Sequence, residues 1–328
     1  MPEGRFTEAL KKHQNLADRF NFSRNFLEKA RNSTASLLGA EWPNVAIFAA
    51  GSLGRLETGR SSDLDVFFLA KSSGTSPDAL HPVSRLEEIS LFAKLIEINT
   101  QLNLPKFSGD GRYLKVHDLQ RVISSTGDAH DDSENLFTTR LLLLLESKSL
   151  WNDDLRKEAI SKVLAYYFKD GKGKKDFRPL FFLNDVLRYW RTLCLNYERD
   201  RVTSSKWWKT NLNLKFSRKL TVFSTVLIIL TKAAIDEASF ISMTEKVPLE
   251  RLAYALDVLG DNSLLEKFIL FLDDYESFLA AKSHDELHQP SEESKQEFRS
   301  KAESFGEFLH TVLMNENIDA TLRRYVLV

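Results

Sequence analysis

Two aspartates, Asp63 and Asp65, follow a glycine–serine pair in a segment that reads GSLGRLETGRSSDLDVFFL over residues 51–69. Because side chains alternate along a strand, carboxylates two residues apart point to the same face. Such a pair offers the hard oxygen ligands that Mg²⁺ prefers. Small residues at Gly51 and Ser52 leave space for a phosphate to approach the backbone. The segment therefore predicts a site for a divalent metal and a triphosphate.

Two apolar runs must position these residues. Residues 45–50 read as a buried strand that leads into the glycine–serine turn, which Gly54 keeps tight. Residues 66–69 are apolar throughout, as expected of a central strand that is covered on both faces. The turn and the carboxylates should therefore lie together at the mouth of one sheet.

The segment contains an ordered motif, which consists of Gly51-Ser52, Arg55, Glu57 and Ser62-Asp63-Leu64-Asp65. This motif resembles the signature of the nucleotidyltransferase superfamily that includes DNA polymerase beta. Its spacing is most similar to the branch that contains the uridylyltransferases of the PII signalling protein and the adenylyltransferases of glutamine synthetase. The resemblance implies transfer of a nucleoside monophosphate from an NTP, such as ATP, to a hydroxyl, with pyrophosphate as the leaving group.

The resemblance also implies roles for individual residues. Asp63 and Asp65 would hold two Mg²⁺ ions, one beside the attacking oxygen and one on the triphosphate. Ser52 and the backbone amides from Gly51 onward would cradle the phosphates. Arg55 would pair either with a phosphate or with Glu57.

Members of this superfamily usually place a third carboxylate on the strand beside the Asp-x-Asp strand. The candidate strand here, residues 113–117, contains no acid. Asp110 at its start and Asp118 at its end are therefore the candidates for the third metal ligand. We favour Asp110, because its turn could open onto the same sheet edge as Asp63.

Helical periodicity dominates the rest of the chain. The sequence predicts an α+β fold, in which a small mixed-sheet domain that ends its sheet before about residue 125 is followed by an all-helical domain. The predicted parts are N-terminal helices over residues 1–35 that pack on the catalytic domain, a nucleotidyltransferase domain over 36–150 and a helical domain over 151–328. Near the N-terminus, Asn21 or Ser23 should cap the second of two helices.

Three cations of the helical part are candidates for contact with the nucleotide. Arg188 lies near Asp185 in an otherwise apolar helix, so it engages either an internal network or the nucleotide. Lys215 and Lys219 belong to a basic stretch, residues 204–219, that also contains two tryptophans. Such a stretch can supply cations to a triphosphate or bind single-stranded nucleic acid by stacking.

Composition limits the partners. The formal net charge of the 328 residues is −1 at pH 7, so bulk charge does not indicate a nucleic-acid partner. The single cysteine favours the reducing cytoplasm, and no apolar run is long enough to predict a membrane span. The acceptor stays open among a protein, an RNA and a small molecule. Two other functions also stay open: a catalytically weak nucleotide-binding sensor, and a regulatory protein that acts through its helical part.

Overall fold

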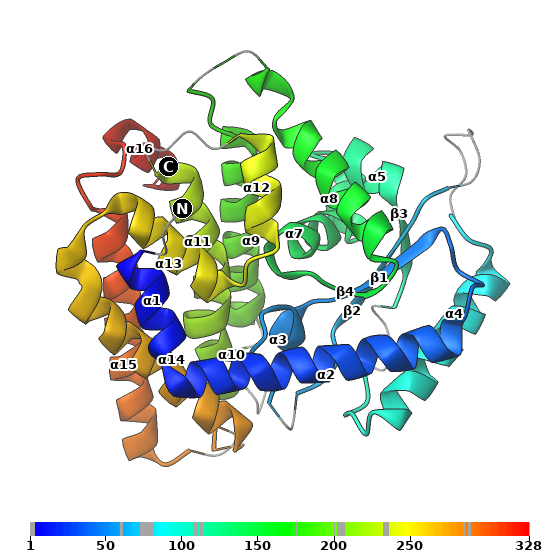
Figure 1. Ribbon diagram of the computed structural model, residues 1–328, viewed down its shortest axis with the longest axis horizontal. Helices are drawn as coiled ribbons and strands as arrows, with labels where there is room; N and C mark the ends of the chain where they lie inside the picture. The colour runs from blue at the N-terminus through cyan, green and yellow to red at the C-terminus, as the bar shows by residue number, and fades with distance from the viewer. Residues whose placement is uncertain are drawn as a thin grey trace. The chain divides into compact units, whose positions relative to one another are not determined.

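A computed structural model describes the chain as a mixed α/β protein with one small mixed sheet and many helices (Figure 1). The chain divides into two compact units, which we call the sheet unit, residues 19–169, and the helical unit, residues 1–18 with 170–328. The described residues are 4–59, 62–72, 82–107, 111, 114–172, 174, 176–199, 201, 207–231, 236–284, 286–287 and 290–327.

The strands and most of the early helices belong to the sheet unit. Its elements are β1 (Val45–Ala49), α3 (Gly51–Gly54), β2 (Val66–Ala70), α4 (Arg85–Gln101), β3 (Val116–Asp118), α5 (Leu119–Ser124), α6 (Ala129–Ser133), α7 (Leu136–Glu146), β4 (Lys148–Trp151), α8 (Asp153–Tyr167) and most of α2 (Gln14–Leu38).

Helices make up the helical unit as far as the structure describes it. They are α1 (Arg5–Lys12), α9 (Leu180–Arg199), α10 (Trp207–Asn213), a π-helical turn (Leu214–Arg218), α11 (Lys219–Leu230), α12 (Glu237–Thr244), α13 (Pro248–Leu259), a 3₁₀ turn (Asn262–Leu264), α14 (Leu265–Ser283), α15 (Glu292–Leu313) and α16 (Ala320–Leu327). A further 3₁₀ turn (Lys169–Gly171) lies where the two units join in the chain. None of the described helices is both long enough and apolar enough to cross a membrane.

The sheet has the strand order β3-β2-β1-β4. β1 pairs antiparallel with both β2 and β4, whereas β2 and β3 run parallel. All five residues of β1 are buried, as the apolar run at 45–50 predicts for a central strand. The two strands expected around the glycine–serine turn are thus confirmed.

β4 corrects the prediction that the sheet ends before about residue 125. It follows α7 directly and pairs with β1, where Phe48 lies opposite Ser149. With only four residues, Lys148–Trp151, the strand is too short to show a period-2 pattern that stands out from the helices on either side.

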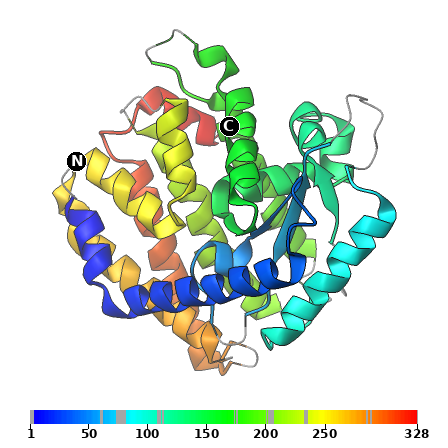
Figure 2. The ribbon, with the colours of Figure 1, turned by 45° about the vertical axis from the view of Figure 1, so that its right-hand side comes forward.

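Side-chain exposure alternates along the start of β2. Leu64, Val66 and Phe68 are buried, whereas Asp63, Asp65 and Phe67 are only half-buried. α4 lies beside the sheet (Figure 2, in cyan). It covers the Phe68 face, where its Phe92 ring packs edge-on against Phe68 at a centroid distance of 5.2 Å. The two aspartates therefore share the face opposite α4.

The N-terminal helices break at a different point from the one predicted. α1 ends at Lys12, and α2 then runs without interruption from Gln14 to Leu38, so neither Asn21 nor Ser23 caps a helix. Ser23 is fully buried, and its hydroxyl accepts a hydrogen bond from the Thr58 amide at 3.0 Å. From the sequence alone, a polar side chain that accepts a hydrogen bond from a distant backbone amide cannot be distinguished from one that caps a helix.

α7 is buried nearly all round and carries one buried arginine. The Arg140 guanidinium donates to both carboxylate oxygens of Asp131 at 2.8 Å, to the Val122 carbonyl at 2.8 Å and to the Tyr167 hydroxyl at 2.9 Å. Bidentate pairing of this kind compensates for the loss of solvent around both charges. The pair fixes α6 against α7.

His117 on β3 makes the stability of the protein depend on pH. Burial lowers the pKa of its imidazole from an ordinary value of 6.5 to about 4, and the positive charge of Lys115 adds to this effect. Between these two pH values the unfolded chain takes up a proton that the folded protein does not. The contribution of neutral His117 to the unfolding free energy is therefore present in full above pH 6.5. It is lost as the pH falls toward 4, which lowers the unfolding free energy by up to roughly 3 kcal/mol.

We expect His117→Leu to reduce the difference in unfolding free energy between pH 7 and pH 4.5 by roughly 2 kcal/mol, because leucine does not titrate. Urea unfolding at the two pH values measures this difference. His310→Gln, at an exposed position on α15, is the control and should leave the difference unchanged. The same pH dependence in His117→Leu as in the parent protein would contradict the assignment.

Candidate functional site

The glycine–serine turn and the Asp-x-Asp segment meet at one corner of the sheet. The Ala50 amide donates to the Asp65 carbonyl at 2.9 Å, which extends the β1–β2 pairing by one step. Gly51 has a φ of +61°, and a Cβ atom built on it would lie 2.1 Å from Asp65 Oδ2. The Asp65 carboxylate thus occupies the space that a side chain at position 51 would fill, and only glycine fits there.

A buried ion network fixes this turn to α7. Arg55 donates from Nε to Glu57 Oε2 at 2.8 Å and from Nη1 to Glu146 Oε2 at 2.7 Å. The other oxygen of Glu146 accepts the Gly51 amide hydrogen at 3.1 Å. Arg55, Glu57 and Glu146 are each 3% exposed, so these contacts form away from solvent. Of the two partners considered for Arg55, the structure shows Glu57 and adds Glu146.

Glu146 is a site residue that sequence reasoning missed. Its signal is the one acid at the end of a helix that otherwise consists largely of leucines. α3 and α7 also touch at this point, since a Cβ on Gly54 would lie only 1.8 Å from the Glu146 carbonyl oxygen. The position of the glycine–serine turn therefore depends on a residue far away in the sequence.

Backbone strain accompanies the network. Leu56 lies between Arg55 and Glu57 and has a φ of 58°, in the left-handed region that a branched side chain disfavours. This conformation costs about 1–2 kcal/mol. The ion pairs on either side and the hydrogen bond from the Glu57 amide to the Ser52 carbonyl, 2.7 Å, hold it in place. Strain of this kind is typical of functional turns.

Of the two candidates for a third carboxylate, Asp118 lies away from Asp65. Asp118 pairs with Ala70, which is five residues from Asp65 and hence about 16 Å along the strand. Its carboxylate caps α5 by accepting the Arg121 amide at 2.9 Å, and it accepts the Ser72 hydroxyl. Asp110 lies outside the described residues. Because β3 runs parallel to β2, the chain enters β3 from the Asp65 end.

The predicted cations lie in the helical unit. Arg188 has a contact of 3.8 Å with Asp185, which is the internal alternative considered for it. Lys215 lies within the π-helical turn, and Lys219 begins α11. Burial lowers the pKa of Lys219, and the charge of Lys215 lowers it further. All three residues belong to the helical unit, and these contacts are with other residues of that unit.

The tryptophans of the basic stretch each have an arginine above the ring. The Arg201 guanidinium lies 5.5 Å from the Trp207 ring centroid, and the Arg299 guanidinium lies 5.5 Å from that of Trp208. Lys206 lies outside the described residues. The cation–π contacts occupy one face of each ring, which leaves less of the aromatic surface for a stacked base.

No family model, no curated protein and no solved structure matches the chain. The candidate functional site is the corner of the sheet unit where the Gly51 turn, the Asp65 carboxylate and the buried network meet.

We expect Gly51→Ala to lower the unfolding free energy by about 2 kcal/mol more than Gly39→Ala does. Both glycines have a positive φ, 61° and 57°, so both variants incur the left-handed penalty of about 1–2 kcal/mol. Only at Gly51 does the new methyl group meet the Asp65 carboxylate, whereas nothing lies within 4 Å of a Cβ on Gly39.

A double-mutant cycle in urea unfolding separates these effects. Adding Asp65→Ala to Gly51→Ala removes the carboxylate that the methyl group displaces, so the double variant should be more stable than the sum of the single effects predicts. Additive effects would mean that Gly51 and Asp65 do not meet as described.

Proposed function

We propose that the protein is a Mg²⁺-dependent nucleotidyltransferase, which transfers a nucleoside monophosphate from an NTP to a hydroxyl of a protein, an RNA or a small molecule. The observation that carries the proposal is the contact of the Asp65 carboxylate with Gly51 at the first turn after β1. It joins the two halves of the motif, metal ligands and phosphate-binding turn, that such chemistry requires.

The proposed metal ligands are Asp63 and Asp65. They share the half-buried face of the β2 segment, away from α4, so both side chains lie on one side of the strand. When bound there, Mg²⁺ would activate the attacking oxygen and neutralise charge on the triphosphate. Asp110 remains the proposed third ligand, since the chain approaches β3 from the Asp65 end.

The phosphate contacts are proposed for Ser52 and its backbone amide. The Gly51 amide, which we expected to join them, donates instead to Glu146 at 3.1 Å. Arg55 and Glu57 are buried in the same network, so their proposed role is to hold the turn in position. A turn fixed before the substrate arrives needs little reorganisation when charge develops on the phosphates.

We expect Asp65→Asn to lower Mg²⁺-dependent turnover of NTP by at least about a hundredfold, equivalent to about 2.7 kcal/mol in the transition state. The assay follows each labelled NTP into protein, RNA or small molecules, with pyrophosphate release as the second readout. Asp118→Asn is the matched control, because asparagine can also cap α5 and position 118 pairs with the far end of β2.

Three outcomes distinguish the functions. Turnover that falls in Asp65→Asn but not in Asp118→Asn supports the proposal. NTP binding by the parent protein without turnover favours the sensor, with Asp65→Asn then weakening Mg²⁺-dependent binding. Equal turnover in Asp65→Asn and the parent protein contradicts the assignment of Asp65 as a metal ligand.

A further inference from the structure

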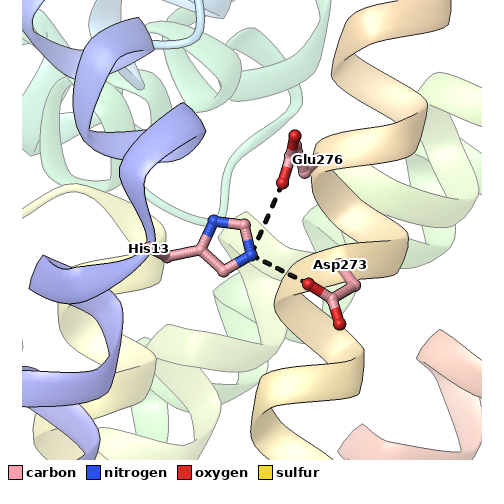
Figure 3. Close-up of side chains that lie close together, drawn as sticks. All are labelled: His13, Asp273 and Glu276. Carbon is pink, nitrogen blue, oxygen red and sulfur yellow. Dashed lines mark hydrogen bonds and ion pairs between the residues drawn. The ribbon is translucent and has the colours of Figure 1, made fainter.

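The helical unit contains a separate group of metal-ligating side chains, at His13, Asp273 and Glu276. Figure 3 shows the His13 ring pointing Nε2 at both carboxylates, which come from α14. We propose that these three residues bind a divalent transition-metal ion of the Zn²⁺ class. The site is independent of the aspartates of the sheet unit.

The geometry of the group is close to that of a coordination sphere. His13 Nε2 lies 3.0 Å from Asp273 Oδ1 and 3.5 Å from Glu276 Oε2, and the three ligand atoms all lie within 4.8 Å of one another. Ligands about 2.1 Å from one ion, at angles between tetrahedral and octahedral values, are separated by about 3.0–3.4 Å. The two distances to His13 already fall near this range, and the two carboxylate oxygens lie no more than 4.8 Å apart.

Rigid elements hold the three side chains. Asp273 and Glu276 are three residues apart and share one face of α14. His13 directly follows α1, which is anchored by the Asp257 carboxylate through the amides of Phe6 and Thr7 at 2.9 and 3.1 Å. A metal ion would therefore join the end of α1 to α14 without a large rearrangement.

Charge favours a cation at this position. Asp273 and Glu276 bring two negative charges, and in the described part of the chain their ion-pair partner is His13 alone, without lysine or arginine. The side chain of Asn15 donates to Glu276, which orients this carboxylate as an outer hydrogen bond orients a metal ligand. A divalent ion would neutralise both carboxylates.

The donor set selects the kind of metal. An imidazole nitrogen with two carboxylates suits Zn²⁺ and its neighbours, whereas Mg²⁺ and Ca²⁺ prefer oxygen ligands throughout. Coordination through Nε2 places the imidazole proton on Nδ1, which is buried and has no hydrogen-bond partner. A histidine ligand without a hydrogen bond on its other ring nitrogen binds a metal ion more weakly, so we expect micromolar rather than nanomolar affinity for Zn²⁺.

A groove lies beside His13. His13 also lines a groove of about 500 Å³ between α1 and α14, with Leu265, Ile269 and Leu272 on its apolar wall. Three protein ligands leave at least one coordination position for water.

Isothermal titration with Zn²⁺, in a Cys194→Ala background that removes the only thiol, tests the site. The parent should bind one equivalent that is lost, or weakened at least tenfold, in His13→Gln, Asp273→Asn and Glu276→Gln. Glu266→Gln removes an exposed carboxylate from the same helix and is the matched control that should bind as the parent does.

Thermal unfolding provides a second readout. Zn²⁺ should raise the melting temperature of the parent and of Glu266→Gln but not that of the three ligand variants. Asp273 is 56% exposed in its side chain, so Asp273→Asn should fold even if the substitution of His13 does not. Unchanged stoichiometry and affinity in Asp273→Asn and Glu276→Gln, or no saturable Zn²⁺ binding by the parent, would overturn the proposal.

Discussion

The buried contact of Arg55 with Glu57 and Glu146 is the interaction on which the corner of the sheet depends. One guanidinium lies between two carboxylates, at 2.8 and 2.7 Å, with all three residues 3% exposed. Removing one partner from a buried ion group typically costs about 3–5 kcal/mol, because it leaves an uncompensated charge in the interior. The network therefore holds the strained backbone at Leu56 and, through it, the turn that follows β1.

The same network holds the turn that contacts Asp65. Glu146 uses one oxygen for Arg55 and the other for the Gly51 amide, so the end of α7 fixes the start of α3. Gly51 then admits the Asp65 carboxylate into the space of its missing side chain. Contacts within the protein therefore hold this turn in place before any ligand binds.

The parts predicted from the sequence are those with a strong local pattern. The apolar runs identified β1 and β2, and the alternation of Asp63, Leu64 and Asp65 indicated a shared face. The predictions that failed concern an element too short to show a pattern and contacts between residues that are distant in the sequence. β4 is too short to show a period, Ser23 serves the Thr58 amide instead of a helix start, and the role of Glu146 depends on folding α7 against the turn. The domain boundaries and the third carboxylate stay predictions.

Crystals grown with Mn²⁺ and a non-hydrolysable NTP analogue would test the central claim most directly, since anomalous scattering locates the metal. We expect Mn²⁺ at about 2.0–2.2 Å from carboxylate oxygens of both Asp63 and Asp65, with the triphosphate over Ser52. Mn²⁺ and nucleotide bound elsewhere, with neither aspartate among the ligands, would contradict it.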